Sequence, residues 1–215
     1  LLVQTLEMRE VSKEKQRTYL THMGQEISRL EDLSERLLAT ARLEQSLSKA
    51  SSSIHDLNEV VESALARQRP VLEARGAVIS FEPSAQPLPV ELDPEAFTLV
   101  LSNLLENAVK YSPDASKPVW VRLKAHDGKA VLEVEDRGVG IERGEVAKVF
   151  EPFYRAGDEG TRETQGLGLG LYLVRSLTEL MGGWVGVEVL GRGARFTVKL
   201  PLQPSSSLAA ERSPA

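Results

Sequence analysis

The sequence predicts an α+β fold, a two-layer α/β sandwich in which helices cover one face of a mixed sheet, preceded by a partial helical hairpin. Two observations predict the sandwich. Apolar residues recur with helical spacing in some segments and alternate as in strands in others. The two kinds of segment do not alternate strictly along the chain, which favours helices gathered on one face of a sheet. The hairpin is predicted from an apolar stripe of coiled-coil spacing near the N-terminus.

Composition excludes several classes of function. The 215 residues are 41% hydrophobic and 27% charged, as in ordinary globular proteins. The net charge is −5 and there is no basic run, so nucleic acid is not an expected partner. Cysteine is absent, which excludes disulfides, thiolate catalysis and Cys-ligated metals. No apolar run approaches the roughly 18 residues of a membrane span. The first residue is Leu1 rather than Met, which favours a fragment of a longer protein.

Residues 1–45 carry the pattern of a partial dimerisation hairpin. Residues 1–12 are interpreted as the end of one helix and residues 14–45 as a second, longer one. An apolar stripe on the second helix is spaced by threes and fours, with Ser34 as an interruption: Leu20, Met23, Ile27, Leu30, Leu37 and Ala41. Nothing nearby in the sequence covers so broad a stripe, so we expect the hairpin to dimerise. An ordinary surface helix is the alternative. The serine-rich residues 46–53 are the expected linker.

Residues 54–202 are expected to form one domain. Asp93 and Pro94 are typical of a helix start, as N-cap and first helical residue, and Gly182-Gly183 is typical of a helix end. Helices are expected at 58–75, 94–111 and 169–181, and strands at 77–82, 119–125, 130–135, 184–190 and 194–200. Residues 203–215, rich in Ser, Pro and Ala, are expected to be a disordered tail.

The first segment that suggests chemistry is Asn103-Leu104-Leu105-Glu106-Asn107-Ala108-Val109-Lys110-Tyr111. Asn103 and Asn107 are four residues apart on a predicted helix, so they share a face, and Lys110 and Tyr111 continue it one turn on. An amide oxygen is a hard, neutral ligand suited to Mg²⁺, and a lysine on the same face can meet phosphate oxygens. The alternative is a pair of surface asparagines on an amphipathic helix.

The second segment is Asp136-Arg137-Gly138-Val139-Gly140-Ile141, directly after a predicted strand. Gly138 and Gly140 let the backbone come close to a flat ligand. An ionised Asp136 accepts hydrogen bonds, for example from an exocyclic amine such as that of adenine. The segment lacks the third glycine and the following helix of a dinucleotide-binding fingerprint. A simple strand-ending turn is the alternative.

The third segment is Gly166-Leu167-Gly168-Leu169-Gly170-Leu171, which enters a predicted helix. Glycines at every second position leave backbone N–H groups free, and a helix N-terminus adds positive potential, so the segment is suited to phosphates. It lacks the lysine of a P-loop. Residues 156–165, which precede it, are polar and contain glycine, as a mobile lid would. A flexible loop with packing glycines is the alternative.

In this order, the three segments resemble the ATP-binding domain of sensor histidine kinases. Residues 150–155 (Phe-Glu-Pro-Phe-Tyr-Arg) are similar to the family's F box, and residues 191–193 (Gly-Arg-Gly) follow as in the family. The resemblance covers residues 54–202 and extends to residues 39–44, which look like the end of the family's second dimerisation helix. It implies binding of ATP and Mg²⁺ and transfer of the γ-phosphate to a histidine. It also implies a homodimer formed by the N-terminal helices, and relay to a response-regulator receiver domain in two-component signal transduction. A cytoplasmic location follows, with anchoring of the parent in the inner membrane left open.

The resemblance also implies roles for single residues. Asn107 is expected to coordinate Mg²⁺, and Asn103 and Lys110 to contact phosphates or metal. Asp136 is expected to accept a hydrogen bond from the adenine amine, and Arg155 to lie near the γ-phosphate. The other expected ATP-binding residues come from the same segments: Tyr111, Gly138, Gly140, Ile141, Gly166, Leu167, Gly168, Leu169 and Gly170. Ala194 departs from the family, in which Thr or Ser is usual, and we expect a small effect because the position can serve packing.

The chain lacks the family's phosphoacceptor box. None of its three histidines, His22, His55 and His126, stands in that pattern, so the chain is not expected to phosphorylate itself on histidine. The runner-up function is that of an ATPase or serine kinase of the wider superfamily, in which Glu at the position of Asn103 acts as general base. An asparagine cannot accept that proton, which favours transfer to histidine, although Glu106 is a nearby carboxylate that could serve as base. A nucleotide-sensing module is the non-enzymatic alternative.

Overall fold

The computed structural model describes residues 19, 20, 23, 52–155 and 168–204 of the chain. The chain divides into two units, residues 1–45 and residues 46–215. Tyr19, Leu20 and Met23, the described residues of the first unit, are helical. The predicted dimerisation hairpin, most of the predicted linker and residues 205–215 of the predicted tail therefore lie outside the described residues.

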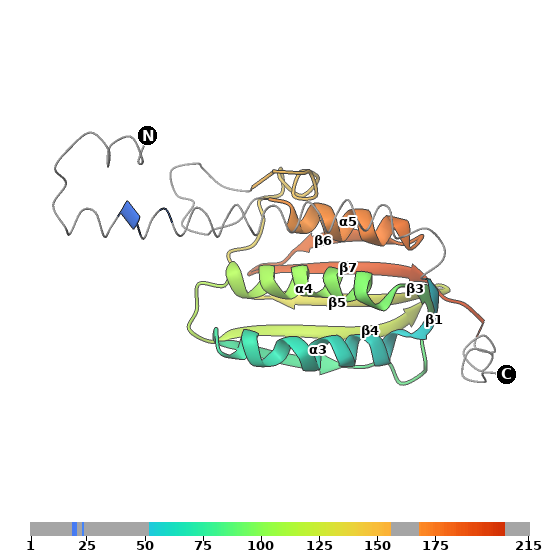
Figure 1. The fold of residues 1–215 in the computed structure, drawn as a ribbon. Helices are drawn as coiled ribbons and strands as arrows, with labels where there is room; N and C mark the ends of the chain where they lie inside the picture. The colour runs from blue at the N-terminus through green and yellow to red at the C-terminus, as the bar shows by residue number, and fades with distance from the viewer. Residues whose placement is uncertain (1–18, 21–22, 24–51, 156–167, 205–215) are drawn as a thin grey trace. The chain divides into compact units, whose positions relative to one another are not determined.

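The second unit is built on a five-stranded sheet with the order β2-β4-β5-β7-β6 (Figure 1). The strands are β2 (Ala77–Glu82), β4 (Lys117–His126), β5 (Lys129–Asp136), β6 (Trp184–Val189) and β7 (Ala194–Pro201). β2 runs parallel to β4, and the other neighbouring strands are antiparallel. The predicted mixed sheet is therefore confirmed.

Three helices cover one face of this sheet (Figure 1): α3 (Leu57–Glu73), α4 (Pro94–Lys110) and α5 (Gly170–Leu180). α4 begins as the sequence predicts, because the Asp93 carboxylate accepts hydrogen bonds from the N–H groups of Glu95 and Ala96 at 2.8 and 3.2 Å. Its apolar side, with Phe97 and Leu101 fully buried, packs toward the sheet. The predicted two-layer sandwich, with helices on one face, is confirmed.

The strands alternate between a buried face toward the helices and a polar face away from them. In β5 the buried row is Ala130, Leu132 and Val134, and it ends in a carboxylate, Asp136. A charged group at the end of an apolar row is costly to bury unless it is hydrogen-bonded, so the end of β5 calls for a specific polar environment.

The structure adds a small antiparallel sheet of β1 (Ser53–Asp56) and β3 (Pro89–Leu92). Ser53, which was assigned to the linker from the sequence, pairs with Leu92 and therefore belongs to the domain. Gln203, assigned to the tail, donates its N–H to the Pro89 carbonyl oxygen at 2.8 Å. β3 was missed because a four-residue strand in a proline-rich stretch carries too short an alternation to be seen.

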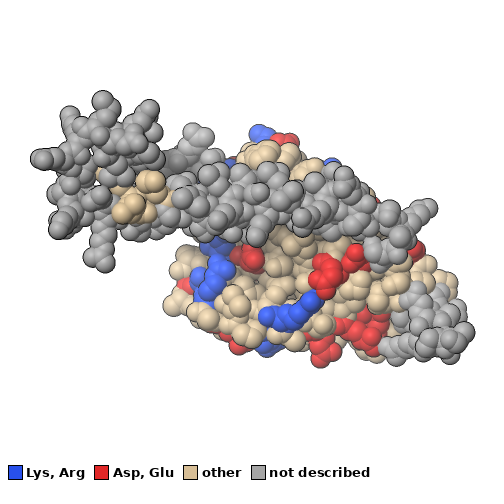
Figure 2. Space-filling view, viewed as in Figure 1, with Lys and Arg blue, Asp and Glu red and all other residues tan. Residues whose placement is uncertain are grey.

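Two observations concern the nucleic-acid partner and the membrane span that the sequence composition argued against. Charged side chains of both signs are interspersed with uncharged surface on the face shown in Figure 2. Among the described helices, none combines the length and apolar content that a membrane crossing requires.

Candidate active site

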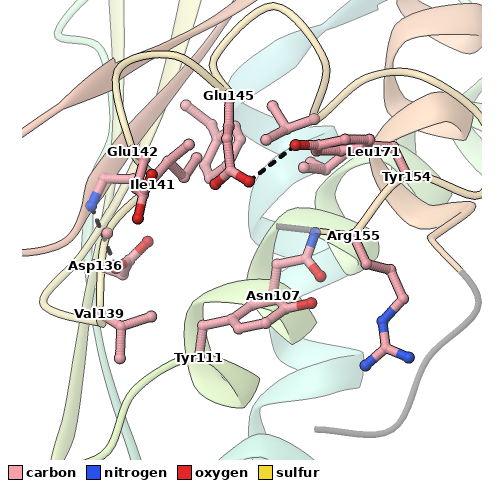
Figure 3. Close-up of a pocket in the computed structure, with 14 residues that line it drawn as sticks. Asn107, Tyr111, Asp136, Val139, Ile141, Glu142, Glu145, Tyr154, Arg155 and Leu171 are labelled. Carbon is pink, nitrogen blue, oxygen red and sulfur yellow. Dashed lines mark hydrogen bonds between the residues drawn. The ribbon is translucent and has the colours of Figure 1, made fainter. Parts of the chain in front are cut away.

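A cavity of about 380 Å³ opens between α4, the end of β5 and the start of α5 (Figure 3). Six residues predicted from the sequence line it: Asn107, Tyr111, Asp136, Gly140, Ile141 and Arg155. Eight further residues complete the lining: Val139, Glu142, Glu145, Val149, Tyr154, Leu171, Ala194 and Phe196. A mostly apolar wall with a few convergent polar groups is typical of a small-molecule site.

Asp136 is held in one orientation by the backbone. Its Oδ1 accepts hydrogen bonds from the N–H of Gly138 at 2.7 Å and from the N–H of Ala194 at 3.3 Å. The residue is only 7% exposed, and no other hydrogen bond to its carboxylate occurs among the described residues. Burial raises the pKa of the Asp136 carboxyl, the two N–H donors partly offset this, and the charge of Glu135 adds to the rise. The second carboxylate oxygen is thus available to a ligand in the cavity.

Close backbone contacts build the end of the cavity around Asp136. A Cβ added to Gly138 would lie 2.7 Å from the Tyr111 carbonyl oxygen, which itself accepts the N–H of Val139 at 3.1 Å. Gly193, with φ +82°, lies so close that a Cβ there would collide with the Asp136 carbonyl oxygen. These contacts explain why glycine is needed at both positions.

The opposite end of the cavity is lined by polar side chains. Asn107 comes from the last turn of α4, and Arg155 from the segment before α5 (Figure 3). Tyr111, which caps the end of α4, also lines the cavity, beside the end around Asp136 where its carbonyl oxygen contacts Gly138 and Val139. The Lys110 Nζ lies 4.9 Å from the centroid of the Tyr111 ring, beside the cavity but outside its lining. On the facing wall the Tyr154 hydroxyl donates a hydrogen bond to Glu145 Oε1 at 2.9 Å.

Asn103 lies apart from its partner Asn107, although both are on the same predicted helix face. It is 6% exposed, and its Nδ2 donates to the Leu99 carbonyl oxygen at 2.8 Å. Its Oδ1 would be 2.9 Å from a Cβ added to Gly170. Asn103 therefore packs α4 against the first residue of α5 and is not part of the cavity lining. Its predicted contact with phosphate or metal stays a prediction.

The remaining predicted residues surround the cavity or lie outside the described residues. Gly168 packs on the F-box segment, because its carbonyl oxygen accepts the N–H of Phe153 at 3.1 Å and a Cβ on it would lie 2.5 Å from the Tyr154 carbonyl oxygen. The other residues outside the lining are Glu106, Lys110, Gly138, Leu169 and Gly170. Gly166 and Leu167 fall in residues 156–167, outside the described part of the chain.

Sequence reasoning missed part of the lining for identifiable reasons. The alternation of β7 places Phe196 on the same face as Ala194, so this signal was present but did not indicate a cavity. Glu142 and Glu145 lie in a segment of successive turns without helical or strand periodicity. No pattern in the sequence could place these two carboxylates beside the site.

Comparison with known proteins identifies the family. Residues 92–204 match the family described as "Histidine kinase-, DNA gyrase B-, and HSP90-like ATPase". This match spans more than half of the 215 residues. The chain belongs to this family. Within the matched residues, the cavity lies between helix α4, which carries Asn107, and strand β5, which ends in Asp136.

The family's sensor histidine kinases are well represented among the similar proteins. The alginate biosynthesis sensor protein KinB of Pseudomonas aeruginosa is 32% identical over 181 residues, which is 84% of this chain and 30% of that protein. The sensor histidine kinase AtsR of Burkholderia thailandensis is 35% identical over 119 residues, or 54% of this chain and 20% of that protein. The chain thus spans less than a third of the length of these curated relatives.

Solved structures agree with this placement. A mycobacterial sensor histidine kinase, MprB, is 31% identical with a TM-score of 0.59, and the match covers 71% of this chain and 99% of that one. Full-length ShkA in complex with AMPPNP is 29% identical with a TM-score of 0.70, over 93% of this chain and 41% of that one.

Proposed function

We propose that this chain is the ATP-binding catalytic core of a sensor histidine kinase, which transfers the γ-phosphoryl group of ATP to a histidine for relay to a response-regulator aspartate. The observation that carries the proposal is the pairing of Asp136, a buried acceptor fixed by two backbone N–H groups, with Asn107 and Arg155 at the other end of the same cavity. Further support comes from the relatives named sensor histidine kinases and from the ShkA complex with AMPPNP.

The end of the cavity around Asp136 suits adenine. The available carboxylate oxygen can accept a hydrogen bond from the exocyclic amine, and a base with a carbonyl at that position would instead bring two acceptors together. Val139, Ile141 and Ala194 contribute apolar surface beside it, and Gly140 allows the backbone close to a flat ring. This end of the site would therefore select adenine through one hydrogen bond and shape.

The opposite end suits a magnesium-bound triphosphate. Asn107 lines the cavity and carries an amide oxygen, a hard ligand of the kind that Mg²⁺ takes, so the residues present fit this ion. Arg155, with Lys110 beside the Tyr111 ring, would contribute positive charge toward the phosphates. Bound Mg²⁺ would supply further charge neutralisation as the phosphoryl group is transferred. The N–H groups at the start of α5 and of the glycine segment before it would add donors.

The reaction needs positioning more than acid–base chemistry. A neutral imidazole nitrogen already has a lone pair, so it can attack the γ-phosphorus directly. The N–P bond forms as the P–O bond to the β-phosphate breaks, ADP leaves, and the imidazole proton passes to solvent. Arg155 would stabilise the negative charge on the transferring group, because a fixed cation strengthens electrostatic stabilisation where water is excluded.

Hydrolysis or transfer to a hydroxyl is the alternative, and a specific observation keeps it in view. Asn103 cannot accept a proton and is buried under Gly170, but two carboxylates, Glu142 and Glu145, line the cavity. Glu145 already accepts the hydrogen bond of the Tyr154 hydroxyl, which makes it a weaker base candidate. Glu142 would be the residue to test if the chain released inorganic phosphate.

The proposal is tested with labelled ATP. The chain is incubated with Mg²⁺, γ-labelled ATP and a supplied histidine-containing helix pair, and the products are treated with acid or alkali. We expect acid-labile, alkali-stable label on the helix pair and none on the chain itself. Release of inorganic phosphate without transfer would favour the ATPase alternative, and absence of nucleotide binding at millimolar ATP would overturn the whole proposal.

The organisation of the chain is proposed on the same basis. Residues 1–45 would be part of a dimerisation hairpin, 46–53 a linker, 54–202 the ATP-binding domain and 203–215 a tail, with Ser53 and Gln203 reassigned to the domain as described above. A homodimer would form through the N-terminal helices. Sedimentation of the chain with and without residues 1–45 checks this, because only the longer form is expected to dimerise.

A further inference from the structure

A row of charged side chains crosses all five strands on the face of the sheet away from the helices. Its members alternate in sign in the order of the strands: Glu82 on β2, Arg122 on β4, Glu135 on β5, Arg195 on β7 and Glu188 on β6. Each member forms an ion pair with the next, at N–O distances of 2.9 to 3.5 Å. We call this row the outer ladder.

The centre of the outer ladder is Glu135. Its Oε2 accepts from Arg122 Nη1 at 2.9 Å, and from Arg195 Nη2 and Nε at 2.9 and 3.1 Å. Its side chain is 17% exposed, so these bonds are better shielded from water than ordinary surface ion pairs. Two arginines from different strands thus share one oxygen, and β4, β5 and β7 are joined at one level of the sheet.

Glu135 and Arg195 are next in sequence to two residues that line the nucleotide site, Asp136 and Ala194. Glu135 immediately precedes Asp136, and Arg195 immediately follows Ala194; Glu135 and Arg195 are register partners across β5 and β7. Successive side chains of a strand point to opposite faces of the sheet. The ion pair of Glu135 and Arg195 therefore joins β5 and β7 on the outer face, next to the point where Asp136 and Ala194 meet on the face covered by the helices. The bond from the Ala194 N–H to Asp136 Oδ1, at 3.3 Å, is at the long end for a hydrogen bond. It therefore depends on how closely β7 is held to β5.

We propose that Arg195 and Glu135 are positioning residues for the nucleotide: their ion pair behind the sheet keeps the Ala194 N–H on the Asp136 carboxylate and so keeps the other carboxylate oxygen available to adenine. The inference rests on the proposed function. Neither side chain lines the cavity, so an effect of these residues on binding would be indirect, and the proposed route is through Asp136.

The chain contains a matched control for this effect. Lys124 and Glu133 form an ion pair at 2.6 Å between β4 and β5, on the same face of the sheet. Glu133 lies between Leu132 and Val134 and is three residues from Asp136, so its pair joins the same sheet without flanking the site. Loss of this pair should disturb the sheet without moving the carboxylate.

The experiment measures AMPPNP–Mg²⁺ affinity by calorimetry and stability by thermal unfolding. The test variants are Arg195→Gln and Glu135→Gln, which keeps the side-chain shape; the controls are Lys124→Gln and Glu133→Gln. We expect the test variants to weaken AMPPNP about three- to tenfold and the controls to stay within about twofold. Equal effects of the two pairs on affinity would overturn the inference.

A double-mutant cycle supplies the second readout. If Arg195 acts through Asp136, Arg195→Gln should add little to the affinity already lost in Asp136→Asn. Additive losses would show that Arg195 acts on the nucleotide by another route and would overturn the inference. Wild type that fails to bind AMPPNP would count against the proposed function itself, whereas binding that is unchanged by Arg195→Gln and Glu135→Gln would overturn the positioning role alone.

Discussion

The two ends of the cavity are built in different ways. Around Asp136 the geometry comes from backbone: two N–H donors, close glycine contacts and strand register hold one buried carboxylate. At the other end, Asn107 and Arg155 reach the cavity as side chains of a helix and a loop. Backbone contacts can be changed only by disturbing the fold, whereas a side chain at either end can be replaced with the fold intact. The following variants test that difference.

The largest effect is expected at Gly193. Gly193→Ala would force an L side chain into φ +82° and against the Asp136 carbonyl oxygen, and the strain alone costs about 1–3 kcal/mol. Both the free energy of unfolding, measured in urea, and AMPPNP affinity should fall. Gly191→Ala is the control, because no atom lies within 4 Å of a Cβ there. Similar stabilities for the two variants would mean that the end around Asp136 is not set by backbone contact.

Asp136→Asn is expected to weaken AMPPNP by about tenfold or more. A hydrogen bond to a buried charged group contributes roughly 1.5–3 kcal/mol, and the amide can present the wrong group to the adenine amine. The affinity for inorganic triphosphate, measured in parallel, should change much less, because the change is at the adenine end. An unaltered AMPPNP affinity would remove Asp136 from the adenine site.

Asn107→Ala should separate function from stability. We expect about a three- to tenfold loss of AMPPNP affinity in the presence of Mg²⁺, from one lost ligand or hydrogen bond, and little change in Tm. Asn103→Ala is the matched comparison on the same helix. It removes a buried group packed against Gly170, so its main effect should be on Tm. A reversed pattern would mean that the two asparagines have exchanged roles in solution.

The smallest expected effect concerns pH and compares neighbouring carboxyls on opposite faces of β5. For Glu135, burial opposes ionisation, but the hydrogen bonds and charges of Arg122 and Arg195 outweigh it and hold the pKa below its ordinary value of 4.5. Its contribution to stability is therefore present above pH 4.5 and is lost as the pH falls through the lowered pKa.

The pH dependence of stability that comes from Asp136 has the opposite sign, because burial raises the pKa of its carboxyl above the ordinary value of 3.8. Its contribution to stability is present below pH 3.8 and is lost as the pH rises through the raised pKa. Urea unfolding between pH 3 and 6 checks both signs. Glu135→Gln should make the loss of stability toward acid shallower by about 1 kcal/mol or less, and Asp136→Asn should make it steeper. The same slope for both variants would contradict the assignment.

Much of the fold follows from local patterns in the sequence. The start of α4 at Pro94 follows from Asp93 and the fixed φ of proline, and the strands on either side of Asp127-Gly128 follow from their alternation. The segments containing Asn107, Asp136 and Arg155 were found because their residue types and order are specific. β3 was missed because it has four residues in a proline-rich stretch, and so short an alternation is not recognisable as a strand.

By itself, the sequence determined which segments become helices and strands and which side chains can do chemistry, because periodicity, caps and residue type act over a few neighbouring residues. Only the tertiary structure decided which of those side chains reach the cavity. Asn103 and Asn107 share a helix face, yet Gly170 covers one and leaves the other open. Likewise, Glu135 meets Arg195 only through the register of β5 and β7, sixty residues apart. Contacts between distant segments are set by packing and strand register, which a local pattern does not specify.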